Sequence, residues 1–175
     1  THQALQVAKA VENFTSFYLE NPCHSYDENV TVRKHSNLPL IMDEIVMDLP
    51  TLVRAWQEHA VDMVNIKISK FGGITKTKEA IEFCISMGIA MVIEDTWGGD
   101  ITTSAILALA STIPSKLLFA ATDLNSYNTI KTGYFLASDV DGVRMGQNMT
   151  VPKSQPGLGV EPNWKIFEGH LIRNY

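Results

Sequence analysis

Four charged residues in this sequence each end a run of apolar residues. They are Glu20, Asp43, Lys67 and Glu94. Carboxylates such as Glu20 and Asp43 supply the oxygen ligands that a hard divalent cation such as Mg²⁺ prefers. Two carboxylates make an incomplete site, because Mg²⁺ takes octahedral oxygen coordination and needs further oxygens from the protein, a substrate or water. The alternative is that both carboxylates are solvated or form ion pairs.

Lys67 is the candidate acid or base of this set. It ends the run Met63-Val64-Asn65-Ile66, so we expect its amine between low-dielectric walls and beside the predicted cation. Both influences lower the pKa of a lysine and would let it exchange protons near neutral pH. The alternative is an ion pair with Glu20 or Asp43 that holds the strand ends together. Lys70, in the turn that follows, is expected to face solvent.

The spacing of these four residues predicts the elements that position them. They lie 23, 24 and 27 positions apart, and each interval is about the length of one strand and one crossover helix. In a (β/α)₈ barrel the carboxyl ends of such parallel strands point to a common mouth. A closed barrel typically has about 250 residues, whereas this chain has 175. The predicted fold class is therefore α/β, as part of a (β/α)₈-type (TIM) barrel.

Helical periodicity and end signals complete this outline. Asp48 is a predicted N-cap, Gly88 is a predicted C-cap, and Asp100 is predicted to cap the helix that follows it. Helices are expected around residues 4–14, 26–35, 49–60, 75–87 and 101–112, with a fifth strand at 117–121. The periodicity weakens beyond Asn125. We predict one partial barrel domain over residues 1–175, with about five βα units in 1–125 and an irregular tail in 126–175.

Composition excludes some classes of partner. The net charge is −5 and Lys and Arg are scattered along the chain, whereas binding to nucleic acid requires them in clusters. The sequence contains no apolar run of about 18 residues, so we expect no membrane span. The two cysteines, Cys23 and Cys84, have no metal-site spacing and are too few for a disulfide framework. This pattern favours a reducing compartment, and we expect a cytoplasmic location.

Several runs of residues resemble one enzyme family in their order and spacing. These runs are Leu19-Glu20-Asn21-Pro22-Cys23, Pro39-Leu40-Ile41-Met42-Asp43-Glu44, Asn65-Ile66-Lys67-Ile68-Ser69-Lys70-Phe71-Gly72-Gly73-Ile74 and Pro156-Gly157-Leu158-Gly159-Val160. With them the chain resembles, over nearly its whole length, the mandelate racemase and muconate-lactonizing group of the enolase superfamily. The segments 93–103 and 121–127 are similar to one branch, the cis-3-hydroxy-L-proline dehydratases and hydroxyproline-betaine 2-epimerases.

The resemblance implies a magnesium enzyme whose site is only partly carried by this chain. It implies that Glu20 and Asp43 are the second and third Mg²⁺ ligands and that Lys67 is the catalytic lysine. It also implies that the chain corresponds to the C-terminal part of the barrel. The first strands, with one metal ligand and another lysine base, and the N-terminal capping domain would lie outside these residues. We expect this polypeptide alone to be inactive or nearly so. The missing barrel half would have to be supplied in cis or by another chain, or a second copy of this chain would have to take its place.

The resemblance also narrows the substrate to a proline-type amino acid. Glu94 or Asp95 is expected to pair with a protonated ring nitrogen, and Trp97 to pack over the ring or simply beneath its own loop. Thr122 and Asp123 follow the last predicted strand and are further candidates for substrate binding. A quaternary betaine nitrogen prefers an aromatic cage, and Trp97 is the single aromatic residue expected near the mouth. This favours dehydration of cis-3-hydroxy-L-proline.

Two alternatives stay open at the level of the sequence. Lys67 could protonate a departing hydroxyl in a dehydratase, or deliver a proton to carbon in a 2-epimerase, so this residue does not separate the two reactions. The chain could also be a non-catalytic, doubly wound α/β module that binds a ligand or takes part in assembly. That module would have edge strands that need cover.

Overall fold

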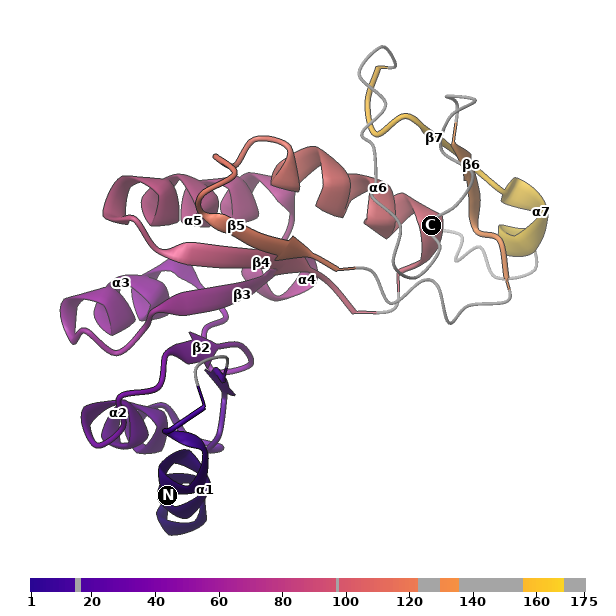
Figure 1. Ribbon diagram of the computed structural model, residues 1–175. Helices are drawn as coiled ribbons and strands as arrows, with labels where there is room; N and C mark the ends of the chain where they lie inside the picture. Colours follow the sequence, from indigo (N-terminus) through magenta and orange to yellow (C-terminus); the bar gives the residue numbers. More distant parts are fainter. Residues whose placement is uncertain (15–16, 97, 123–129, 136–155, 169–175) are drawn as a thin grey trace, which may run out of the picture.

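The main feature of the structure is one parallel sheet whose strands follow the order of the sequence. The structure is a computed structural model, and it describes residues 1–14, 17–96, 98–122, 130–135 and 156–168 (Figure 1). The strand order is β1-β2-β3-β4-β5, and every neighbouring pair is parallel. These strands are β1 (Leu19–Glu20), β2 (Leu40–Met42), β3 (Met63–Lys67), β4 (Ala90–Glu94) and β5 (Leu118–Ala121).

Helices connect the strands and lie along one side of the sheet (Figure 1). The helices of this part are α1 (His2–Val11), α2 (Tyr26–Lys34), α3 (Leu49–Gln57), α4 (Ile68–Phe71), α5 (Ile74–Met87) and α6 (Gly99–Ala110). Beyond them, β6 (Gly133–Phe135) and β7 (Val160–Pro162) form an antiparallel pair, followed by α7 (Trp164–Phe167). In the part of the chain that the structure describes, no helix is long and apolar enough to cross a membrane.

Local sequence signals set several of these boundaries as predicted. The Asp48 carboxylate accepts a hydrogen bond from the backbone N–H of Thr51 and caps α3, and Pro50 occupies its first turn. The Ser25 hydroxyl caps α2 in the same way. Gly88 ends α5 in the left-handed conformation, with φ of 73°, which glycine adopts without a steric penalty. Ser25 and Asp48 thus mark where α2 and α3 begin, and Gly88 marks where α5 ends before β4.

The two faces of the sheet have different roles. Side chains that alternate along the central strands, such as Val64 and Ile66 of β3, are fully buried in the main core, which also contains residues of the covering helices. The opposite face carries a small second cluster formed by Ile41, Met63 and Val92. Because side chains alternate, Asn65 and Lys67 share this second face with Met63. This face of β3 is therefore apolar at Met63 and polar toward the carboxyl end of the strand, at Asn65 and Lys67.

A ring contact shows that the sheet is strongly curved. Tyr18, just before β1, and Phe119, in β5, have ring centroids 5.4 Å apart. In a flat sheet of five strands the two outer strands would be about 19 Å apart, at about 4.8 Å per step. The first and last strands must therefore bend toward each other. Sequential strand order, helices on one side and this curvature confirm the predicted barrel portion and contradict the doubly wound alternative, which needs helices on both faces.

Some details differ from the sequence predictions. Helix α6 begins at Gly99, with Gly98 in the N-cap position, so the prediction that Asp100 caps this helix is wrong. Asp100 lies in the first turn, and its carboxylate instead accepts hydrogen bonds from the backbone N–H groups of Thr132 and Gly133. The short helix α4 was not predicted. The antiparallel pair lies against α6, where the Ser104 hydroxyl also donates to the carbonyl of Leu158. Residues 126–129, 136–155 and 169–175 of the predicted tail lie outside the described residues.

Candidate functional site

The carboxyl ends of β1 to β4 bring together the charged residues that the sequence singled out. Lys67 is the centre of this group. Its Nζ lies 2.6 and 2.5 Å from the two carboxylate oxygens of Asp43 and 3.1 Å from Oε1 of Glu94. Asp43 is 4% exposed, so its charge is compensated by protein groups more than by water. The predicted meeting of these strand ends is confirmed.

The predicted lowering of the lysine pKa is wrong for this arrangement. Burial does lower the pKa of Lys67, but its hydrogen bonds to Asp43 and Glu94 and the attraction of both carboxylates outweigh burial and raise the pKa well above its usual value. The ion pair that the sequence left open as an alternative is therefore present. Lys67 stands at the mouth as an ammonium.

The prediction that Lys70 faces solvent is wrong. Its Nζ lies 3.7 Å from Oδ1 of Asp43 and 3.9 Å from Oε1 of Glu44, and its side chain is 21% exposed. The short helix α4 turns this lysine back over the strand ends. Lys70 therefore adds a second cation at longer range, while Glu44, which is mostly exposed, adds a further carboxylate near Lys67 at 3.4 Å.

Glu20 lies beside an asparagine that the sequence analysis assigned no role. The amide Nδ2 of Asn65 in β3 donates to Oε1 of Glu20 at 2.8 Å, across the intervening strand β2. The pKa of Glu20 is raised, first by burial and then by repulsion from Asp43, Glu94 and Glu44. A signal for Asn65 was available, because it is a polar residue inside an apolar run and two positions before Lys67.

Among the described residues predicted to bind substrate, Glu94 contacts Lys67. Its second oxygen, Oε2, accepts a hydrogen bond of 2.9 Å from the hydroxyl of Thr122, so two of the predicted residues lie together. Asp95 instead accepts hydrogen bonds from the backbone N–H and hydroxyl of Ser69 and from the backbone N–H of Thr96. Both Asp95 oxygens thus accept hydrogen bonds from Ser69 of α4, and Oδ1 also accepts one from Thr96. Trp97 and Asp123 lie outside the described residues.

The donor set fits a hard divalent cation in type and charge. Glu20 and Asp43 are carboxylates that end adjacent strands. Burial first and then repulsion from the neighbouring carboxylates raise the pKa of Glu20, and a bound cation would offset that repulsion. Within the described ranges no group of three or more His, Cys, Asp and Glu side chains is placed to hold a metal ion. The further oxygen ligands that Mg²⁺ requires must therefore come from other protein residues, a substrate or water. A cation on Asp43 would also compete with the Lys67 ammonium for the same carboxylate.

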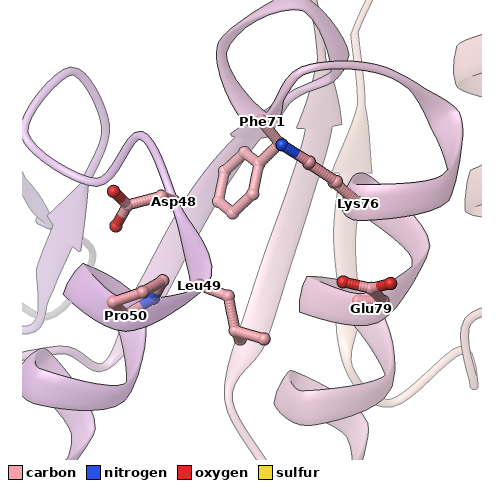
Figure 2. A pocket seen from close by; sticks show the side chains of 6 residues that line it. All are labelled: Asp48, Leu49, Pro50, Phe71, Lys76 and Glu79. Atoms are coloured by element: carbon pink, nitrogen blue, oxygen red, sulfur yellow. The ribbon is translucent and has the colours of Figure 1, made fainter.

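A cavity of about 280 Å³ lies apart from these residues, between α3 and α5 (Figure 2). It is lined by Asp48, Leu49, Pro50, Phe71, Lys76 and Glu79. None of the four charged strand-end residues contributes to it. The candidate site is therefore the curved face of the sheet at the strand ends, and this outer cavity is not part of it.

Comparison with proteins of known sequence gives a match over most of the chain. Residues 1–166 match the family model described as Enolase C-terminal domain-like. The chain is 45% identical, over 99% of its length, to a cis-3-hydroxy-L-proline dehydratase of Roseibium aggregatum, and it covers 45% of that protein. A stretch of 43% of the chain is 34% identical to an L-Ala-D/L-Glu epimerase of Francisella tularensis subsp. novicida and covers 22% of it. The chain thus spans less than half the length of these curated relatives.

Solved structures share the fold. The crystal structure of a mandelate racemase/muconate lactonizing enzyme from Roseovarius nubinhibens ISM superposes with a TM-score of 0.83 at 32% identity, over 94% of this chain and 42% of that one. An enolase superfamily member from the same organism, complexed with magnesium, superposes with a TM-score of 0.79 at 27% identity, over 93% of this chain and 42% of that one. The resemblance noted in the sequence is confirmed.

Proposed function

Because the chain belongs to the enolase C-terminal domain-like family, we propose that its strand-end residues serve magnesium-assisted removal of an α-proton from a proline-type amino acid. The specific reaction we propose is the dehydration of cis-3-hydroxy-L-proline. The observation that carries this proposal is the Lys67 ammonium, held by Asp43 and Glu94 next to Glu20. The high identity to a cis-3-hydroxy-L-proline dehydratase supports the choice of substrate.

Glu20 and Asp43 are the residues that would hold the cation. Bound Mg²⁺ would act as a Lewis acid and stabilise the negative charge that develops on the substrate carboxylate when the α-proton leaves. Glu20 has one oxygen engaged by Asn65, and Asp43 has both oxygens engaged by Lys67. The bond from Asn65 orients Glu20, as neighbouring groups commonly do for ligand carboxylates, whereas Mg²⁺ would have to displace the Lys67 ammonium from an oxygen of Asp43.

Lys67 would act as the general acid. In cis-3-hydroxy-L-proline the hydroxyl group shares a ring face with the carboxylate and lies opposite the α-hydrogen. A base on the far face takes the α-proton, the electron pair forms the carbon–carbon double bond, and the C–O bond breaks. Lys67 gives its proton to the departing oxygen, which leaves as water. The contacts with Asp43 and Glu94 keep Lys67 protonated, so that it carries the proton to be donated.

Glu94 would bind the protonated ring nitrogen of the substrate. The hydroxyl of Thr122 fixes Oε2 of Glu94, and Lys67 contacts Oε1, so the carboxylate has a defined orientation. A carboxylate held in this way can accept a charge-assisted hydrogen bond from a secondary ammonium group. Asp95, Trp97 and Asp123 stay predictions as further contacts with the substrate.

Epimerisation is the second candidate. An epimerase is among the relatives of this chain, although the similarity covers a shorter stretch. In that reaction Lys67 would deliver its proton to the α-carbon, and no water would leave. Incubation of the substrate in deuterated water separates the two reactions, since epimerisation leaves deuterium at the α-carbon of a recovered amino acid and dehydration consumes that amino acid.

Calorimetric titration with Mg²⁺ tests the site directly. We expect binding by the wild-type chain and at least a tenfold loss of affinity in Glu20→Gln and in Asp43→Asn, because each removes the charge of a ligand. Glu44→Gln is the matched control, since this neighbouring carboxylate is mostly exposed. A following titration with cis-3-hydroxy-L-proline should show binding that depends on Mg²⁺. Affinity for Mg²⁺ that survives both ligand substitutions would contradict the proposal.

Two further predictions, the need for residues outside this chain and the cellular location, are also proposals. We propose that catalysis needs residues beyond this segment, namely another metal ligand and the base for the opposite face of the substrate. We also propose a cytoplasmic location. Cys23 and Cys84 support it in part, because both are buried, free thiols.

A further inference from the structure

Asn65 is the one residue of the β3 interior that breaks its apolar pattern, and its surroundings are unusual. The residue is 6% exposed and lies on the same face of the strand as Lys67. Its amide Nδ2 donates to Oε1 of Glu20 at 2.8 Å. Its other polar atom, Oδ1, is buried and has no hydrogen-bond partner among the described residues.

Such an atom is rare in a folded protein. Buried side-chain oxygens nearly always accept a hydrogen bond, because an unpaired polar atom that has lost its water is unfavourable. An apolar side chain of the same size would avoid this problem at a position surrounded by Val64 and Ile66 in the sequence. The amide at position 65 must therefore be explained by what it contacts, and in the described structure it contacts Glu20.

We propose that Asn65 is a positioning residue for the cation site. Its amide N–H group holds Oε1 of Glu20 and thereby leaves Oε2 as the oxygen for the cation. Its Oδ1 is the acceptor for a water molecule that the hydrated cation brings with it. This inference rests on the proposed function, because it takes Glu20 as a ligand of Mg²⁺.

Two general properties of metal sites support this assignment. Mg²⁺ gives up its water reluctantly and usually keeps several water molecules, each of which can donate hydrogen bonds. Ligand carboxylates are themselves hydrogen-bonded by neighbouring groups that fix their orientation. Asn65 offers both functions from one amide, since Nδ2 donates to the ligand and Oδ1 is left to accept.

A purely structural role makes the opposite prediction for stability. If Asn65 only supported the fold, its replacement by leucine would lower the melting temperature and leave cation affinity unchanged. If it positions Glu20, the same replacement removes an unpaired buried oxygen and should not lower the melting temperature in the absence of Mg²⁺. The affinity for Mg²⁺ should then fall, because the ligand is no longer held.

The test compares the full chain with Asn65→Leu by calorimetric titration with Mg²⁺ and by thermal unfolding without the cation. We expect a 10- to 100-fold weaker affinity, in the range found for other residues that support metal ligands, and an unchanged or higher melting temperature. Asn65→Ala is the second variant in case leucine is not accommodated, with the same expected loss of affinity. Thr77→Val is the matched control, since Thr77 is fully buried in α5 and its hydroxyl donates to Gly73.

The outcomes separate this inference from the proposed function. If the wild type binds Mg²⁺ and both Asn65 variants bind it equally well, the positioning role is wrong and the proposed function stands. If the wild-type chain does not bind Mg²⁺, Glu20 and Asp43 do not form a cation site in this chain, and the role of Asn65 there is overturned, whereas the proposed function, which includes a further metal ligand, stands. A matching loss of affinity in Thr77→Val would also overturn the inference, because the effect would then belong to any buried polar group.

Discussion

Charges of both signs meet at the strand ends, and the carboxylates outnumber the ammonium groups. The carboxylates are Glu20, Asp43, Glu44 and Glu94, and the nearby cations are Lys67, which contacts Asp43, Glu44 and Glu94, and Lys70, which lies near Asp43. Lys67 is in direct contact with the most buried of these carboxylates, Asp43. The lysine therefore stabilises the site in the structure as well as serving the proposed chemistry.

Lys67→Met tests this double role. Methionine has a similar length but no charge, so Asp43 would be left buried without its close partner. Loss of one member of a buried ion pair typically costs about 3 kcal/mol or more, and we expect a decrease of that size in the free energy of unfolding at pH 7 without Mg²⁺. Addition of Mg²⁺ should restore part of it, because the cation binds the folded state and takes up the charge of Asp43. Urea denaturation with and without Mg²⁺ measures both effects.

Lys70→Met is the control for this substitution. Its contacts with Asp43 and Glu44 are longer, at 3.7 and 3.9 Å, and such a pair typically contributes less than about 1 kcal/mol. If Lys67→Met and the wild type have the same free energy of unfolding, Lys67 does not stabilise the buried negative charge of Asp43. Where the missing barrel half is also supplied, the dehydration reaction should be lost in Lys67→Met whether or not Mg²⁺ restores stability, because methionine carries no proton to donate.

The sequence predicted which strand ends carry chemistry but not how their side chains pair. Glu20, Asp43, Lys67 and Glu94 were identifiable because a charge that follows an apolar run is a local signal. The direction of the Lys67 pKa shift was not, because it depends on Asp43 and Glu94, which are more than 20 residues away in the chain. Asn65 had a local signal, as a polar residue inside an apolar run, but its partner Glu20 is 45 positions away and only the fold shows their contact.

At the scale of elements, boundaries with a local cause were predictable and those with a distant cause were not. Asp48 and Gly88 act on the backbone of their own helices, and both were identified correctly. Asp100 is at a helix start too, but its carboxylate is used by Thr132 and Gly133 of a segment that follows much later. Helix α4 is only four residues long and has no periodicity to detect.

The cap of α3 gives a prediction with a defined pH dependence. Hydrogen bonds from Thr51 hold the pKa of the Asp48 carboxyl below its usual value. A lowered pKa in the folded state means that the stabilisation is present above the pKa of the unfolded chain and is lost as the pH falls through the folded-state pKa. We expect Asp48→Ala to cost about 1 kcal/mol at pH 7 and progressively less below about pH 4, where an aspartate takes up its proton. Urea denaturation across this pH range measures the difference.

Asp48→Asn is the matched variant for this cap. Asparagine caps helices about as well as aspartate, but it has no charge to lose in this range. Its stability relative to Asp48→Ala should therefore be nearly independent of pH. If Asp48→Ala has the stability of the wild type at pH 7, the hydrogen bond to Thr51 does not contribute to the fold.

At the scale of the whole molecule, the described sheet is curved but not closed. β1 and β5 are its outer strands, and each pairs with a single neighbour in the sheet that the structure describes. Aromatic side chains gather near these edges, with Phe14 in contact with Phe17 and Tyr18 in contact with Phe119, and all four are at least 45% exposed. Open strand edges next to exposed aromatic rings favour pairing with further strands.

We therefore expect the isolated 175-residue chain to self-associate in a concentration-dependent way, because a second copy can cover these edges. Phe119→Lys should shift it toward the monomer, since a lysine on an edge strand resists pairing and Phe119 is 52% exposed. Met87→Lys is the matched control, because Met87 is exposed at the end of α5 and away from the sheet edges. Light scattering over a range of concentrations measures the mass of each variant. A wild-type chain that stays a monodisperse monomer would mean that these edges are covered within the chain itself, and the need for a separate barrel half would lose its physical basis.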